Sequence, residues 1–133
     1  MNLPVYPVEW RSRIPSLLQF IHHTIGLGRV SNLVLLTAMI YMDRLRSSLS
    51  PSAKGAPDTS HRLFLAAIML ADKYIYDVPS MTCSHLSTIV NRMYRSDEIN
   101  KMESTLLNML DHDLSVDQTT LSPYLTRYEF VPE

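Results

Sequence analysis

The pattern of apolar and polar residues predicts a bundle of helices built around one fully apolar segment. From Leu63 to Ala71 the sequence is Leu-Phe-Leu-Ala-Ala-Ile-Met-Leu-Ala, and polar residues return at Asp72 and Lys73. Leu, Ala and Met favour helix, and neither Gly nor Pro interrupts the segment. A helix that is apolar on every side must be covered on every side. The run is far shorter than the roughly 20 apolar residues of a membrane span. We therefore predict a central helix over about residues 60–76, enclosed by other helices.

Apolar residues at intervals of three or four predict five more helices. We expect the first from Ile14-Pro15 to about Gly26, because Pro suits the first helical position. The others are expected at 31–46, 84–93, 96–110 and 117–128, and Pro123 makes the bounds of the last one uncertain. No strand pattern of period two occurs. The prediction is an all-α fold: a five-helix bundle around the central helix, plus one flanking helix.

Polar residues with good capping side chains mark where these helices should begin. Ser31 or Asn32 is expected to cap the second helix, and Thr59 or Ser60 the central one. Ser96 is expected to cap the fifth helix and Asp117 the last. Between the second and central helices, residues 47–58 are rich in Ser, Pro and Ala, contain Gly55, and are predicted to form a loop.

Length and composition indicate a single domain. A chain of 133 residues can bury one core. We expect an N-terminal arm over 1–13, a domain over 14–128 and a short tail over 129–133. The arm contains two prolines, and Trp10 is its only large anchor.

Charge and cysteine content narrow the possible partners and location. The chain has 12 basic and 13 acidic residues, whereas surfaces that bind nucleic acid are usually basic. Cys83 is the only cysteine, which excludes an internal disulfide and a cysteine-rich metal site. The N-terminus lacks a secretory signal pattern. We therefore expect a cytoplasmic or nuclear protein that binds neither nucleic acid nor membrane.

The histidines give little support for a catalytic or metal site. His22 and His23 are adjacent and so point to different faces of a helix. His112-Asp113 is the doublet of the HD-type metal phosphohydrolases, but that site needs further ligands from other helices. His61 and His85 could supply them, yet nothing in the spacing brings them to residue 112. A helix-terminal His112 is the favoured interpretation. We expect no catalytic residue, metal or cofactor.

Two charged residues lie next to apolar segments. Lys73 follows the apolar run directly, and Glu103 sits beside the apolar stripe of the fifth helix. From periodicity alone, Lys73 would extend along the surface with its charge in water. Glu103 would be solvated or would pair locally with Lys101 or Arg95.

Four ordered segments resemble the cyclin box, and the resemblance covers roughly residues 14–128. They are Tyr41-Met42-Asp43-Arg44-Leu45, the segment 61–74, the segment 98–107 and the segment 110–116. The Ala53-Lys54-Gly55 loop and the His61-Arg62 start are most similar to the phosphate-pathway (P-type) cyclins of fungi and protists. A single cyclin box also agrees with that group.

The resemblance implies which residues contact a cyclin-dependent protein kinase. Lys73 and Glu103 match the Lys and Glu with which cyclins hydrogen-bond to the kinase near its C-helix. His112 stands where an aromatic is usual, so that contact is weaker or pH-sensitive. Asp43 matches a structural Asp that pairs with an Arg of the first helix, here Arg29 or Arg13. Further apolar contacts are expected from Leu70, Tyr74, Leu106 and Leu107.

The function implied is that of a regulatory subunit. The chain would bind and activate a cyclin-dependent kinase by holding its C-helix in the active position, with no catalysis and no small-molecule substrate of its own. The first helix reads Leu17-Leu18-Gln19-Phe20-Ile21 and lacks the "MRAIL" substrate-docking motif of many cyclins. The alternative is a cyclin-fold transcription adaptor that binds nucleic acid or polymerase machinery, which predicts a basic face.

Overall fold

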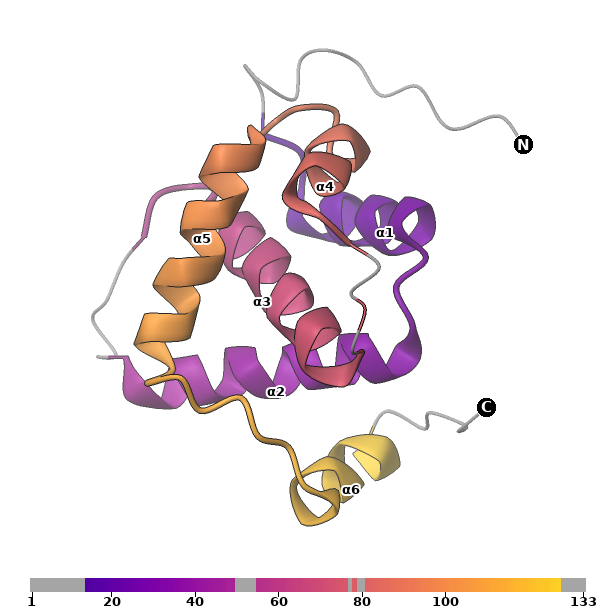
Figure 1. Ribbon diagram of the computed structural model, residues 1–133, viewed down its shortest axis with the longest axis vertical. Coiled ribbons are helices and arrows are strands. Elements are labelled where there is room, and N and C mark those ends of the chain that lie inside the picture. Colours follow the sequence, from indigo (N-terminus) through magenta and orange to yellow (C-terminus); the bar gives the residue numbers. More distant parts are fainter. Residues whose placement is uncertain (1–13, 50–54, 77, 79–80, 128–133) are drawn as a thin grey trace.

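The computed structural model describes residues 14–49, 55–76, 78 and 81–127, and within them all regular structure is helical. The predicted all-α fold is therefore confirmed. Figure 1 shows α3 in the middle of the molecule, with α2, α5 and α1 around it and α6 packed beyond α2. The six helices are α1 (Leu17–Gly28), α2 (Asn32–Ser48), α3 (Thr59–Ile75), α4 (Cys83–Ile89), α5 (Ser96–Met109) and α6 (Gln118–Arg127).

Helix α3 is buried along almost its whole length. Every residue from Phe64 to Asp72 is buried, which agrees with the predicted central helix. Its main neighbours are α2 and α5. Three alanines, Ala66, Ala67 and Ala71, lie in this buried stretch, and their small side chains let neighbouring helices approach closely. The apolar run thus forms the centre of the core because it presents no polar face to water.

Capping side chains set several helix ends. The hydroxyls of Ser16, Ser31 and Thr82 accept hydrogen bonds from backbone N–H groups in the first turns of α1, α2 and α4. The first helix therefore begins at Leu17, two residues after the predicted Pro15. Helix α4 ends at Ile89, earlier than the predicted Met93, because Asn91 and Arg92 adopt φ values of 53° and 57°.

Two capping predictions are wrong. Thr59 and Ser60 are already helical, and Asp58 occupies the N-cap of α3 without a side-chain capping bond. Likewise Ser96 is the first residue of α5, and Arg95 is its N-cap. In both places the N-cap lies one residue before the residue that side-chain capping preferences predict. Asp58 is held by Tyr94 and Arg62, and the Arg95 N–H donates to the Glu98 carboxylate.

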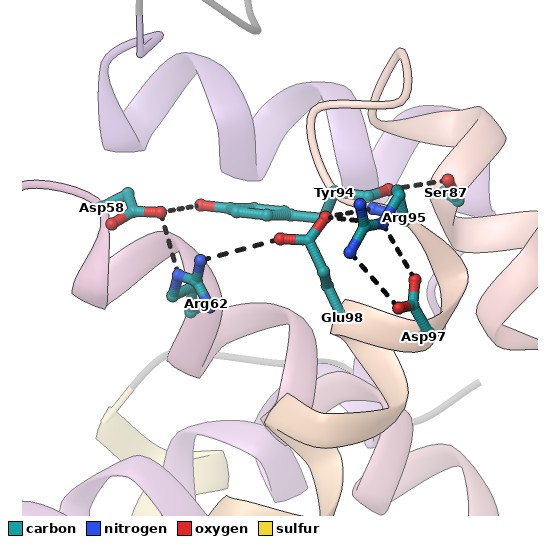
Figure 2. A network of polar contacts seen from close by, with 7 residues as sticks. All are labelled: Asp58, Arg62, Ser87, Tyr94, Arg95, Asp97 and Glu98. Carbon is teal, nitrogen blue, oxygen red and sulfur yellow. Dashed lines mark hydrogen bonds and ion pairs between the residues drawn. The ribbon is translucent and has the colours of Figure 1, made fainter.

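A polar network around Tyr94 fixes the start of α3 (Figure 2). The Asp58 carboxylate accepts hydrogen bonds from the Tyr94 hydroxyl at 2.7 Å and from Arg62 Nε at 2.9 Å. The Arg62 guanidinium also lies 5.0 Å from the centre of the Tyr94 ring. Burial alone would raise the pKa of Asp58, but the bonds from Tyr94 and Arg62 hold that pKa below its ordinary value. Asp58 therefore joins α3 to the α4–α5 connection.

Helix α6 is attached to α2 by polar contacts. The Tyr124 hydroxyl donates to Asp43 Oδ2 at 2.5 Å, and no side chain of α6 is buried. Arg44 donates to the backbone carbonyls of Asp113 and Ser115 on the segment that leads to α6. As predicted, Asp117 caps this helix by accepting from the Thr120 N–H.

The expected pairing of Asp43 with an arginine of the first helix is contradicted for Arg29 and stays a prediction for Arg13. Arg29 forms no ion pair with Asp43 in the described part of the chain, and Arg13 lies outside the described residues. Among the described residues, the partner of the Asp43 side chain is a tyrosine of the last helix.

No helix in the described ranges combines the length and apolar character that crossing a membrane requires.

Two buried histidines join helices to neighbouring backbone. His23 of α1 donates from Nε2 to the Ile89 carbonyl at the end of α4, at 2.5 Å. His61 of α3 donates from Nε2 to the Pro15 carbonyl before α1, at 2.8 Å. Burial lowers the pKa of His23, although the bond to Ile89 opposes part of that effect. The fold therefore favours the neutral imidazole of His23.

We predict that replacing Ala67 by Leu destabilises the fold. Ala67 has no exposed surface. Adding three methylene-sized groups to a packed core costs about 1–3 kcal/mol. Urea unfolding followed by circular dichroism measures the change, with Ser60→Leu at an exposed position of the same helix as the control. Equal stability of the two variants would contradict the described packing of α3.

We also predict that stability falls as the pH drops below about 6.5, the ordinary pKa of histidine. Because the pKa of His23 is lower in the folded chain, the unfolded chain binds the proton first and is favoured by acid. One such proton contributes at most about 1.4 kcal/mol per pH unit. His23→Gln keeps a donor for Ile89 but cannot titrate. In urea titrations between pH 7.5 and 5.5, this variant should lose less stability than the parent chain, and parallel curves would refute the assignment.

Candidate functional site

Lys73 and Glu103 meet where α3 and α5 pack together. Lys73 Nζ lies 2.5 Å from Glu103 Oε1. The Lys73 side chain is 46% exposed, whereas that of Glu103 is 12% exposed. The pair therefore presents a cation to solvent and keeps its carboxylate largely covered. The local alternative is wrong, because Arg95 pairs with Asp97 and Glu98 instead of Glu103.

The second carboxylate oxygen of Glu103 is left without a donor. Oε2 is buried and has no hydrogen-bond partner among the described residues. A buried polar atom that lacks a partner costs about 1–3 kcal/mol, more when it is charged. The site thus offers a lysine ammonium with remaining N–H groups beside an unused carboxylate acceptor. A carbonyl of an incoming chain can bond to the ammonium, whereas an N–H reaches the buried Oε2 only after the Glu103 side chain moves.

Tyr74, Leu107 and Cys83 lie next to the pair in sequence or space. The exposed Tyr74 ring is fixed at its far end, where its hydroxyl accepts from the Val116 N–H at 3.1 Å. Leu107 is partly buried and packs against the core. Cys83 is half-buried, and burial together with the Glu103 charge raises the pKa of its thiol. The surroundings of the pair are therefore a mixture of one exposed aromatic and partly covered apolar groups.

Two of the expected contact residues lie in the core. Leu70 is 2% exposed and Leu106 is 1% exposed. With so little free surface, they support the pair from beneath and offer almost nothing for a partner to touch. Of the expected apolar contacts, Tyr74 and Leu107 are the accessible ones.

His112 lies at the other end of α5 in an exposed turn. Its ring Nε2 is 3.1 Å from Asn108 Oδ1, and its backbone adopts a φ of 60°. Asp113 accepts from the Ser115 hydroxyl. The described residues contain no group of three or more His, Cys, Asp or Glu side chains that could hold a metal. His61, one of the ligands considered for the HD-type site, is buried and bonded to Pro15.

Sequence analysis missed Cys83 as a neighbour of the pair and Tyr94 as the centre of the network in Figure 2. Neither has a local sequence signal, since both act across connections between helices.

Comparison with known proteins agrees with the resemblance. The family model for the cyclin N-terminal domain matches residues 6–115. PHO85 cyclin-1 of Saccharomyces cerevisiae is 34% identical over 110 residues, which are 83% of this chain and 39% of that protein. PHO85 cyclin-2 of the same yeast is 30% identical over 115 residues, 84% of this chain and 37% of that protein.

The chain spans about two fifths of the length of these curated relatives. No solved structure gives a significant match. The family model covers most of the chain, and its bounds include the Lys73–Glu103 site. The chain belongs to the cyclin family, and its similarity to PHO85 cyclins agrees with the P-type assignment.

Proposed function

We propose that this protein is a regulatory cyclin subunit that binds and activates a cyclin-dependent protein kinase. Membership of the cyclin family supports the proposal, as do relatives that are named as cyclins of PHO85. The observation that carries it is the Lys73–Glu103 pair, with its exposed ammonium and its unused carboxylate oxygen.

The proposed mechanism is selection of one kinase conformation. An active kinase needs a Lys–Glu ion pair that includes the Glu of its C-helix, so that helix must lie inward. A partner that binds only the inward position shifts the population toward the active state. Helix α3 is suited to this because its buried core position leaves it little freedom to move.

In the proposed interface, the charged residues set the register and the apolar residues supply contact area. Lys73 donates to carbonyls of the kinase, and the largely covered carboxylate of Glu103 holds the ammonium in place, so the pair sets the register. Tyr74 and Leu107 supply accessible apolar area, while Leu70 and Leu106 hold the backbones of α3 and α5 in place. His112 contributes a polar contact at the edge.

The remaining parts of the proposal follow from this role. The chain performs no chemistry and needs no cofactor or small-molecule substrate, and it meets its kinase in the cytoplasm or nucleus. The domain bounds of 14–128, with an arm before and a tail after, stay a prediction.

The adaptor alternative has less support. Binding to nucleic acid would use free basic side chains, but Lys73, Arg62 and Arg95 pair with carboxylates. Arg44 is bonded to backbone carbonyls. With a net charge of −1, the chain has no excess of cations to release the counterions of a phosphate backbone.

We predict that Lys73→Ala and Glu103→Ala each weaken kinase binding. Truncating one member of a buried, hydrogen-bonded charge pair at an interface typically costs about 2–5 kcal/mol. Affinity for cyclin-dependent kinases of the source organism, measured by titration calorimetry or quantitative pull-down, reports the loss. Helical circular dichroism should stay unchanged, because both residues lie at the edge of the core.

Lys101→Ala is the matched control. It removes a lysine from α5 that has no ion-pair partner among the described residues. Kinase binding that is unaffected by Lys73→Ala and Glu103→Ala would reject the proposed interface. An equal loss in the control would mean that overall charge, and not the pair, controls binding.

A further inference from the structure

The segment that joins α5 to α6 is held to the domain by side chains of other helices. Residues 113–117 are neither helix nor strand, so their backbone groups need partners from outside regular structure. The segment passes α2 on its way to α6 (Figure 1). Residues 113–116 are called the exit segment below.

Two side chains of α2 bind the carbonyls of the exit segment. Arg44 donates from Nη1 to the Asp113 carbonyl at 3.1 Å and from Nη2 to the Ser115 carbonyl at 2.6 Å. The hydroxyl of Tyr41 donates to the Leu114 carbonyl between them at 2.8 Å. Tyr41 and Arg44 are three residues apart and therefore lie on the same face of α2. Helix α2 thus fixes three successive carbonyls.

The exit segment in turn holds the exposed aromatic of the candidate site. The Val116 N–H donates to the Tyr74 hydroxyl at 3.1 Å, and Tyr74 is 45% exposed. The Ser115 carbonyl and the Val116 N–H belong to one planar peptide group. Arg44 orients this plane through the carbonyl, and the plane aims its N–H at Tyr74. A residue of α2 is thereby connected to the residue that follows Lys73 on α3.

An arginine suits this position better than a lysine. The guanidinium is a rigid plane with several N–H donors, whereas an ammonium is a compact charge on a flexible chain. Arg44 can therefore bond to two carbonyls in one fixed geometry. Without that bridge, the Ser115–Val116 peptide group could turn and the Tyr74 ring would lose its fixed donor. A ring that is ordered only when a partner binds lowers the affinity for that partner.

We propose that Arg44 is a positioning residue of the kinase-binding surface. By holding the Ser115–Val116 peptide group, it keeps the Tyr74 ring in the orientation that the kinase contacts. This role rests on the proposed function, and it acts through Tyr74 without a direct bond from Arg44 to the kinase.

A double-mutant cycle on kinase affinity tests the proposal. Arg44→Lys keeps the charge but loses the bridge, and Tyr74→Phe loses the hydroxyl that accepts from Val116. Each should weaken binding about 2- to 12-fold, the effect of ordering one side chain at an interface. Because Arg44 acts through Tyr74, adding Arg44→Lys to Tyr74→Phe should weaken binding no further, although it still lowers stability in urea. Titration calorimetry with the source organism's cyclin-dependent kinase that binds the parent chain measures each affinity.

Two substitutions on the same side of the domain serve as controls. Arg46→Lys makes the same exchange two residues along α2, at an exposed arginine that has no ion-pair partner among the described residues. Tyr124→Phe removes the bond to Asp43 and so loosens α6 alone. Both should leave kinase affinity unchanged. If Tyr124→Phe weakens binding as much as Arg44→Lys does, the attachment of α6 controls affinity and the positioning role is wrong.

Hydrogen exchange of the Val116 amide tests the same connection in the isolated chain. Exchange should be faster in Arg44→Lys and in Tyr74→Phe than in the parent chain, and unchanged in Arg46→Lys. Equal exchange in Arg44→Lys and the parent chain would overturn the proposal.

The outcomes separate this role from the proposed function. Kinase binding that Lys73→Ala and Glu103→Ala leave intact rejects the proposed interface, and the role of Arg44 with it. If those variants weaken binding but Arg44→Lys does not, only the positioning role fails. The same holds if the effects of Arg44→Lys and Tyr74→Phe simply add.

Discussion

The burial of α3 on every side is the constraint on which the rest of this structure depends. An apolar helix with no polar face can exist in water only inside other helices, so α2 and α5 have to pack against it. The order of the surrounding helices then follows from short connections, and the ends of α3 become the places where polar residues can emerge. Asp58 and Arg62 emerge at its start, and Lys73 emerges at its end.

The same constraint explains why the candidate site is made of one exposed and one covered charge. Lys73 follows the last buried turn of α3 and reaches water through its long side chain. Glu103 instead belongs to the helix that covers α3, so its carboxylate lies at the edge of the core. A cation and an anion that meet at such an edge are held in one geometry by packing, and this rigidity suits recognition better than catalysis.

Sequence patterns predicted the structural features that depend on local or periodic residue spacing. They failed for features that depend on contacts between residues far apart in the sequence. The apolar run predicted α3 and its burial, and the cyclin-box resemblance brought Lys73 and Glu103 together before the structure did. The capping residue of α3 was missed because Asp58 is fixed by Tyr94, 36 residues away in sequence. The bond from Tyr124 to Asp43 was missed for a similar reason, since Tyr124 lies 81 residues further along the chain. The sequence could not show whether Leu70 and Leu106 pack in the core or contact a partner. Either role requires an apolar residue at the same helical spacing.

The unused Glu103 oxygen has a consequence for the lifetime of the protein. A subunit that is alone carries the whole cost of an anionic atom that is shielded from water and lacks a donor. In the proposed complex, a kinase that supplies the missing N–H removes that cost and, by mass action, lowers the fraction of unfolded chains. An orphan subunit would then be opened and degraded sooner than an assembled one.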